Sequence, residues 1–321
     1  MIISVFGAGA IGSFLTVQLA QHASHQVQVV ARGAQLEAIR SRGLQLLIGE
    51  QQLAARVEAH SDCRAMARPD VVLVTLKTHA LAAAASDLAY LAEQGATMVF
   101  VCNGIPWWWG LDKETAPAPE VMAVVDPAGL SQRIDGAQVV GCVAYSPNTI
   151  IGPGVSRCSS TSSRFVMGPA HPAAAAACDQ VASHLQSSGI AVPPGRNIRQ
   201  EVWQKLLLNA ALSPMAAVTG GNNQQITSDP LLRHFCLQVC DEVVAVAHGE
   251  GIALQFDPSM LAPDKLAPHK PSMLQDMEKG VKLETGSILS AVQVLARASG
   301  TPTPSLDLVS ALVDARVRFR T

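Results

Sequence analysis

Three glycines near the start of the chain have a spacing suited to dinucleotide binding. Gly7, Gly9 and Gly12 form the pattern G-x-G-x-x-G between an apolar run and an amphipathic run. A strand, a glycine turn and a helix in this order let the backbone approach a pyrophosphate at the helix N-terminus. The alternative is a glycine-rich turn that binds nothing. The residues expected to contact a cofactor are those of the whole loop: Gly7, Ala8, Gly9, Ala10, Ile11 and Gly12.

The end of the next predicted strand, residues 27–30, indicates which dinucleotide binds. An acidic residue there would bind the ribose hydroxyls of NAD, whereas an arginine accommodates the 2′-phosphate of NADP. The chain has Arg32 at this place and no Asp or Glu. We therefore expect NADPH as the cofactor, with a solvated surface arginine as the alternative.

Two polar residues follow apolar runs that are typical of central parallel strands. Lys77 follows the run at residues 71–76, and Asn103 follows the run at residues 98–102. Ligands of open α/β sheets bind beyond the carboxyl ends of the strands. Both side chains are thus candidates for the site, and the amide of Asn103 could bind a cofactor or a substrate carbonyl.

A lysine in the second half of the chain could donate a proton. The apolar spacing predicts a helix over residues 198–212, in which Lys205 and Asn209 project from the same face. Lys205 lies between Trp203 and Leu206, and desolvation lowers the pKa of a lysine and makes it a better acid near neutral pH. The alternative is an ordinary surface lysine.

The candidate residues lie in two parts of the chain that differ in their predicted secondary structure. Its 321 residues suggest two domains. A hairpin is predicted at residues 43–57 and short strands at residues 121–167, whereas helical periodicity dominates after Pro193-Pro194-Gly195. We therefore predict an α/β fold, with a Rossmann-type parallel-sheet domain at residues 1–195 and an all-α domain at residues 196–321. Helices of the second domain are predicted at residues 198–212, 230–249, 272–284, 285–299 and 306–318.

Composition and charge argue against several classes of partner. The formal net charge is −2, which does not favour nucleic-acid binding. No apolar run approaches the roughly 18–20 residues of a membrane span, and we expect no leader segment. Seven cysteines without a C-x-x-C pair indicate reduced thiols in the cytoplasm. Cys236 and Cys240, with His234 nearby, could bind a metal, but buried thiols are the preferred interpretation and no metal is expected.

Three of the four tryptophans are consecutive, at Trp107, Trp108 and Trp109. Such clusters cover a pocket or form an interface. An equally weighted alternative is that they fill a local part of the core.

Together these residues resemble the ketopantoate reductases, or 2-dehydropantoate 2-reductases, over nearly the whole chain. The similarity includes the glycine loop and Arg32. It continues with Leu76-Lys77 and Asn103-Gly104 after the two central strands. The matching segments of the second half are Trp203-Gln204-Lys205-Leu206 with Asn209, and Pro271-Ser272-Met273-Leu274-Gln275-Asp276 with Glu284.

The resemblance implies NADPH-dependent reduction of 2-dehydropantoate to pantoate, for pantothenate and coenzyme A biosynthesis, in a cleft between the domains. Lys205 would be the general acid, and Glu284 would bind a substrate hydroxyl or Lys205. Asn103, Asn209 and Ser272 would hold the substrate, and Asn103 would also contact the nicotinamide end of the cofactor. Expected partners are a small 2-oxo acid and a second copy of the chain.

Some positions differ from the common family pattern. They are Cys102 for Gln, Ser213 for Asn, Gly286 for Asp and Leu289-Ser290 for Asn-Gly. These differences lie around the substrate rather than at the lysine or the glycine loop, so they bear on which 2-oxo acid is reduced and not on the type of reaction. Three alternatives to the reduction of 2-dehydropantoate are open. One is a reductase of another 2-oxo acid, and the second is a 3-hydroxyacid or polyol-phosphate dehydrogenase. The third is a non-catalytic NADPH-binding sensor.

Overall fold

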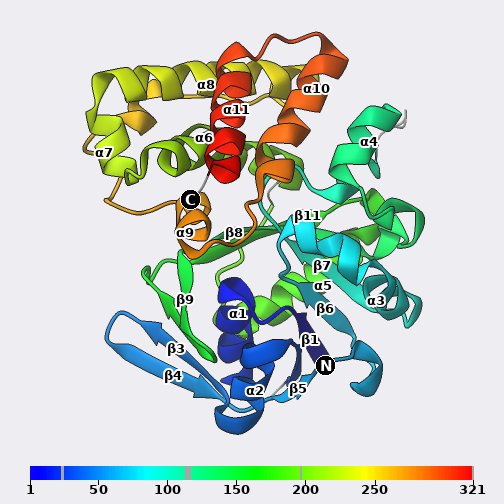
Figure 1. The fold of residues 1–321 in the computed structure, drawn as a ribbon. Coiled ribbons are helices and arrows are strands. Elements are labelled where there is room, and N and C mark those ends of the chain that lie inside the picture. Colours follow the sequence, from blue (N-terminus) through cyan, green and yellow to red (C-terminus); the bar gives the residue numbers. More distant parts are fainter. Residues whose placement is uncertain (23–24, 113–116, 196, 320–321) are drawn as a thin grey trace. The chain divides into compact units, whose positions relative to one another are not determined.

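The computed structural model describes residues 1–22, 25–112, 117–195 and 197–319 (Figure 1). These residues form two compact units. The first comprises residues 1–102, 108–112 and 128–198, and the second comprises residues 103–107, 117–127 and 199–319. A short segment that follows a strand of the first unit therefore belongs to the second.

A seven-stranded sheet is the centre of the first unit, in the order β11-β8-β7-β6-β1-β2-β5. Every neighbouring pair is parallel except β11 with β8. The inner strands are short apolar runs that are buried almost throughout, as expected of a parallel sheet. The predicted Rossmann-type sheet is thus confirmed. Its strands are β1 (Ile2–Phe6), β2 (Gln26–Val30), β5 (Glu58–His60), β6 (Val71–Val74), β7 (Thr97–Val101), β8 (Val139–Tyr145) and β11 (Arg164–Pro169).

A second sheet of four strands has the order β4-β3-β10-β9. Its strands β3 (Leu44–Ile48) and β4 (Gln51–Ala55) form the predicted hairpin, and β9 (Asn148–Gly152) pairs with β10 (Val155–Cys158). The parallel pairing of β3 with β10 was not predicted, because it joins segments more than a hundred residues apart.

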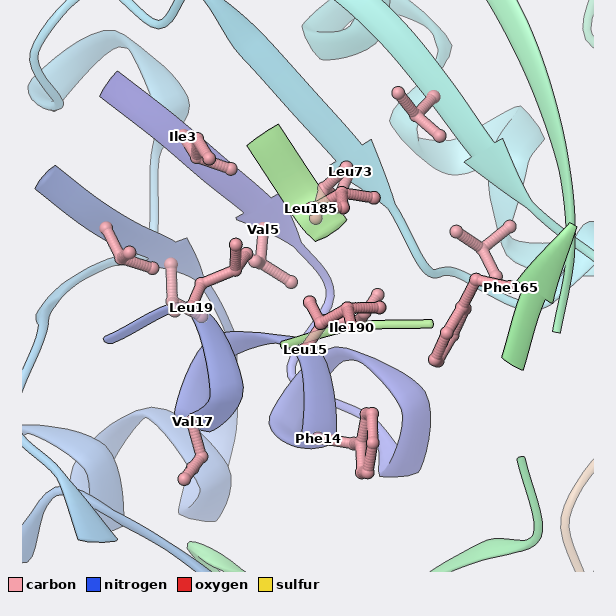
Figure 2. Close-up of a cluster of buried hydrophobic side chains, with 14 of the residues drawn as sticks. Ile3, Val5, Phe14, Leu15, Val17, Leu19, Leu73, Phe165, Leu185 and Ile190 are labelled. Carbon is pink, nitrogen blue, oxygen red and sulfur yellow. The ribbon is translucent and has the colours of Figure 1, made fainter. Parts of the chain in front are cut away.

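Helix α1 (Ala10–Ala20) contacts strands of both sheets, which explains why it is buried on nearly every side. Figure 2 shows Phe14, Leu15 and Leu19 of this helix among apolar side chains of the sheet. The ring of Phe14 stacks on Phe165 of β11 at 5.7 Å between centroids. The other α-helices of this unit are α2 (Gly33–Arg42), α3 (Leu81–Glu93) and α5 (Ala175–Ser187).

The second unit consists of helices, and α11 lies across α8 (Figure 1). Glu242 of α8 accepts hydrogen bonds from the backbone N–H groups of Ser305 and Leu306 at 2.8 Å, which caps the start of α11. The all-α character predicted for this part of the chain is confirmed. The helices are α4 (Pro119–Val125), α6 (Ile198–Thr219), α7 (Asn223–Ser228), α8 (Pro230–Gly249), α9 (Ser272–Lys279), α10 (Ala291–Ser299) and α11 (Pro304–Arg318), with a π-helical turn at Gly286–Ser290.

Three local predictions need correction. Strands were expected from residue 121, but Pro119 and Glu120 open helix α4, since proline in the first turn and an acidic residue near the N-terminus favour a helix. The helix predicted at residues 198–212 continues to Thr219 through Pro214. The helix predicted at residues 272–284 is wrong beyond Lys279, because Gly280 adopts a left-handed conformation that ends α9.

The three consecutive tryptophans lie in a 3-10 turn, Trp107–Gly110, and none is more than 3% exposed. The ring of Trp108 packs so closely on Gly141 of β8 that a Cβ there would lie 2.4 Å from it. Their burial favours the interpretation as core residues over an exposed interface. Among the described helices, none has both the length and the apolar composition to cross a membrane.

Candidate active site

The glycine loop between β1 and α1 has a backbone that requires glycine. Gly7 has a φ of +107°, a backbone conformation that residues other than glycine rarely adopt. A Cβ on Gly12 would lie 1.9 Å from the carbonyl oxygen of Gly7. Thr75, which follows β6, donates its hydroxyl to the same carbonyl at 2.6 Å. Thr75 was not among the predicted site residues, and its only sequence signal is its place at a strand end.

The N-terminus of α1 is open at Gly9. This residue is exposed, no side chain caps the helix there, and a Cβ would meet nothing within 4 Å. Ala8 is buried, whereas Ala10 and Ile11 at the start of the helix are partly exposed. Free N–H groups and the positive end of the helix dipole attract an anionic group. The loop therefore fits the phosphates of a dinucleotide.

Two side chains brace this loop from outside. Gln35 of α2 donates to the carbonyl oxygen of Ala8 at 2.8 Å and accepts from the backbone N–H of Gly154 at 2.9 Å. Ser13 donates its hydroxyl to the Ala8 carbonyl at 3.2 Å. Gln35 had no motif to mark it, because its partners lie 27 and 119 residues away.

Arg32 lies just beyond β2, where it precedes the first residue of α2. Its side chain is 67% exposed, and Nη2 lies 3.9 Å from Oδ2 of Asp87. An exposed ion pair of this length contributes little. Asp87 is held more closely by Arg64, at 2.8 Å. The guanidinium of Arg32 can therefore turn toward a phosphate without loss of a strong contact.

Lys77 lies three residues beyond β6, at the start of a short 3-10 turn, and is partly exposed. Strand β6 pairs with β1 in the sheet. Lys77 and the glycine loop thus follow neighbouring strands; the sequence predicted that Lys77 follows a central strand but not which strand lies beside it.

Asn103 joins Lys205 and Glu284 by two side-chain hydrogen bonds. Nζ of Lys205 donates to Oδ1 of Asn103 at 2.7 Å, and Nδ2 of Asn103 donates to Oε2 of Glu284 at 3.4 Å. All three residues belong to the second unit. Because the ammonium can only donate and the carboxylate can only accept, the two contacts fix the orientation of the amide.

The elements that hold these residues are well packed. Lys205 is partly exposed on α6, while its neighbours Trp203 and Leu206 are buried, so the apolar setting inferred from the sequence is present. Glu284 is 8% exposed and precedes the π-helical turn. Glu201, which is also buried, lies one helical turn before Lys205 and was not predicted as part of the site.

The arrangement is suited to proton donation toward an oxygen atom. An ammonium group fixed by a neutral amide, with a carboxylate one hydrogen bond further, can neutralise negative charge that develops on a bound carbonyl oxygen.

The other two predicted site residues lie on elements of the same unit. Asn209 is partly exposed one turn after Lys205 on α6, so it shares the face of that lysine. Ser272 is exposed as the first residue of α9. The helix break at Gly280 separates Ser272 from Glu284.

The paired cysteines of α8 are part of the core. The thiols of Cys236 and Cys240 approach carbonyl oxygens of α6, those of Ala211 and Leu207, at 3.8 and 3.7 Å. Burial raises the pKa of Cys236 to about 12 and that of Cys240 further. These protonated thiols are poor metal ligands.

One other group of possible metal ligands occurs among the described residues, at Asp62, Cys63 and Asp87. Arg64 already pairs with both carboxylates, at 3.4 and 2.8 Å. Burial raises the pKa of Cys63 to about 11, with Asp87 adding to the effect. The guanidinium of Arg64 already neutralises the carboxylates, and the protonated thiol of Cys63 is a poor ligand, so this group does not favour metal binding.

The first unit has a Rossmann-type sheet with an open glycine loop, and the helical unit holds a hydrogen-bonded lysine, amide and carboxylate. Together these features define an oxidoreductase fold. The family model described as Ketopantoate reductase PanE/ApbA matches residues 3–171, and its C-terminal counterpart matches residues 197–317. The chain therefore belongs to the ketopantoate reductase family.

Individual relatives agree with this assignment. A 2-dehydropantoate 2-reductase of Mesorhizobium japonicum is 33% identical over 98% of this chain and 97% of its own. A structure of a proposed ketopantoate reductase from Ralstonia solanacearum MolK2 is 29% identical, has a TM-score of 0.88 and covers 99% of this chain and 98% of its own. D-mandelate dehydrogenase with NADH and anilino(oxo)acetate shares the fold at 20% identity, with a TM-score of 0.84 and 99% coverage of both chains.

Proposed function

We propose that this chain reduces 2-dehydropantoate to pantoate with NADPH, as a step of pantothenate and coenzyme A biosynthesis in the cytoplasm. The observation that carries the proposal is the amide of Asn103, which is hydrogen-bonded to Lys205 on one side and to Glu284 on the other. A sensor that only binds a dinucleotide has no need of an oriented ammonium and carboxylate.

The cofactor would be held by residues 1–195, the proposed NADPH-binding domain. The loop from Gly7 to Gly12 would bind the pyrophosphate at the N-terminus of α1. Arg32 would select the 2′-phosphate, since its guanidinium is exposed and only weakly paired. Lys77, beyond the strand next to β1, would add positive charge. When bound, the nicotinamide supplies the hydride, and the protein supplies orientation and the proton.

The residues of the second unit would carry out the proton chemistry, in the proposed catalytic domain at residues 196–321. Lys205 would protonate the oxygen of the former ketone, which gains negative charge as its carbon is reduced. Asn103 would hold Nζ of Lys205 and, beside the nicotinamide, the substrate carbonyl. Glu284 would bind a substrate hydroxyl, and Asn209 and Ser272 would bind its remaining polar groups.

The experiment is an assay of NADPH oxidation with 2-dehydropantoate and a panel of other 2-oxo and 3-oxo acids. Lys205→Ala should lower kcat by about 100-fold or more, while the affinity for NADPH is kept. Lys282→Ala, at an exposed lysine, is the matched control. Near-normal turnover by Lys205→Ala would refute the assigned role, and a better substrate in the panel would replace 2-dehydropantoate.

We also propose that the chain forms a homodimer through the outer face of α11. Leu308, Leu312 and Phe319 are 53%, 43% and 77% exposed on this face. Asp307 and Arg318 lie near its two ends, so an antiparallel pair of α11 helices brings each aspartate near the arginine of the other copy. Light scattering on Phe319→Ser should then show a monomer. Leu231→Ser, at a leucine that is 80% exposed on α8, should leave the mass unchanged.

A further inference from the structure

The backbone beside Asn103 touches the backbone beside Glu284. Gly104 has a φ of +74°, and a Cβ on it would lie 2.3 Å from the carbonyl oxygen of Ser287 and 2.9 Å from the backbone nitrogen of Ile288. The next residue, Ile105, donates its N–H to the Ser287 carbonyl at 2.9 Å and is itself buried. Only glycine fits at position 104, both by conformation and by space.

This backbone contact lies next to the side-chain contact of the site. Asn103 precedes Gly104, and Glu284 lies three residues before Ser287. The carbonyl of Glu284 accepts a hydrogen bond from the N–H of Ile288 at 3.3 Å, which joins the glutamate to the same turn. The segment of Asn103 is therefore attached to the segment of Glu284 twice, once through side chains and once through the main chain.

The turn that receives the contact is unusual. Residues Gly286–Ser290 form a π-helical turn, in which the N–H of Ala291 bonds to the carbonyl of Gly286. Such turns are rare and occur often at functional sites. Here the Ser287 carbonyl accepts from Ile105, a partner outside the helix, and Ser287 is 7% exposed. The π-helical turn, which lies just before α10, therefore binds the backbone of the segment that follows Asn103.

We propose that Gly104 and the π-helical turn Gly286–Ser290 are positioning elements, whose backbone contact holds Asn103 where its amide spans Lys205 and Glu284. The inference rests on the proposed function, in which Lys205 is the proton donor. Neither Gly104 nor Ser287 is assigned a contact with the reacting atoms, and both act through Asn103.

A displaced Asn103 would change the charge state of Lys205. The amide oxygen at 2.7 Å favours the ammonium form, so its withdrawal lowers the pKa of Lys205. Among the described residues, two carboxylates lie near this lysine: Glu284, reached through Asn103, and Glu201, one turn earlier on α6.

The test measures the protonation of Lys205 directly. The rate of reductive methylation of its amine, followed by mass spectrometry across pH, reports the amine pKa without any need for turnover. The variants are Gly104→Ala, and Asn103→Ala as the reference for a lost amide. Gly300→Ala is the matched control, because Gly300 has a φ of +69° in the same unit and open space around its Cβ position.

We expect Gly104→Ala to move the midpoint to lower pH, in the same direction as Asn103→Ala, and Gly300→Ala to leave it unchanged. The kcat of Gly104→Ala should fall on the order of 100-fold, and the double variant with Asn103→Ala should be no slower than Asn103→Ala alone. An unmoved midpoint, or effects on kcat that add, would overturn the proposal.

Two further experiments test the positioning role of Gly104 separately from protein folding and from the role of Lys205. If Gly104→Ala does not fold, the pH midpoint of Lys205 methylation is measured on Ser287→Gly instead. This variant loosens the π-helical turn without adding a clash, so a shift of its midpoint to lower pH supports the proposal and an unmoved midpoint overturns it. If Lys205→Ala keeps its turnover, the assigned role of Lys205 as the proton donor fails. The methylation midpoint still shows whether Gly104 positions Asn103.

Discussion

The amide oxygen of Asn103 lies 2.7 Å from Nζ of Lys205, although 102 residues separate them in the chain. The nitrogen of the same amide faces Glu284. One neutral side chain thus sets the environment of a cation and an anion at once. A change of its charge should therefore act on both neighbours.

Asn103→Asp should shift the alkaline limb of the pH–rate profile to higher pH and lower kcat. A carboxylate beside Lys205 favours the ammonium and raises its pKa, whereas repulsion from Glu284 disturbs the geometry. Asn103→Ala should shift the limb in the opposite direction. The measurement is kcat/KM across pH, and equal shifts by the two variants would contradict the assignment.

Gly12→Ala and Gly9→Ala should separate folding from cofactor binding. A Cβ on Gly12 meets the Gly7 carbonyl at 1.9 Å, so this variant should lose at least about 3 kcal/mol of stability. Gly9 has open space, so Gly9→Ala should cost about 1 kcal/mol or less. Both should weaken NADPH binding. Urea denaturation and cofactor titration check the pair, and equal losses of stability would refute the distinction.

Arg32→Ala should raise the KM for NADPH about tenfold or more, the equivalent of one charge-assisted hydrogen bond, and leave the KM for NADH nearly unchanged. Arg42→Ala is the control, because Arg42 is held by the carbonyl of Pro153 at 3.2 Å. If the KM values for NADPH and NADH rise equally, Arg32 does not bind the 2′-phosphate selectively.

His25 should make the first unit sensitive to acid. Burial lowers the pKa of His25, and His184, whose ring lies edge-on at 5.4 Å, adds to this effect. A histidine with a lowered folded pKa stabilises the protein above its unfolded pKa of about 6.5. That stability is lost as the pH falls from there toward the folded value. His25→Gln should have a flatter Tm profile below neutral pH, and parallel profiles would contradict this.

The cysteines of α8 should be unreactive in the folded protein. Because burial raises the pKa of Cys236 to about 12 and that of Cys240 further, few thiolates form near neutral pH. Iodoacetamide followed by mass spectrometry should label both only after denaturation. Rapid labelling of the native protein would show that the interface of α6 and α8 opens.

Much of the fold could be predicted because its signals are local. The glycine spacing identified the turn from β1 to α1, and apolar periodicity gave α8 with its observed ends. Gly280 was also visible in the sequence as a stop for α9, but its left-handed conformation was not recognised. The extension of α6 through Pro214 was hidden, because its stability comes from packing that outweighs a local penalty.

The sequence named candidate site residues but not the contacts between them. Spacing on one helix places Asn209 one turn from Lys205. No periodicity relates either residue to Asn103 or Glu284, whose contacts depend on tertiary structure. Thr75, Gln35 and Gly104 support the site from separate elements for the same reason.

The helical unit is not one continuous piece of chain, since residues 103–107 belong to it. This matters for recombination between members of the family. A chimaera joined near residue 195 would exchange Lys205 and Glu284 but keep the Asn103 of the other parent. The loop at Gly104 would then have to fit a foreign π-helical turn. Functional chimaeras should therefore transfer residues 103–107 together with the C-terminal half.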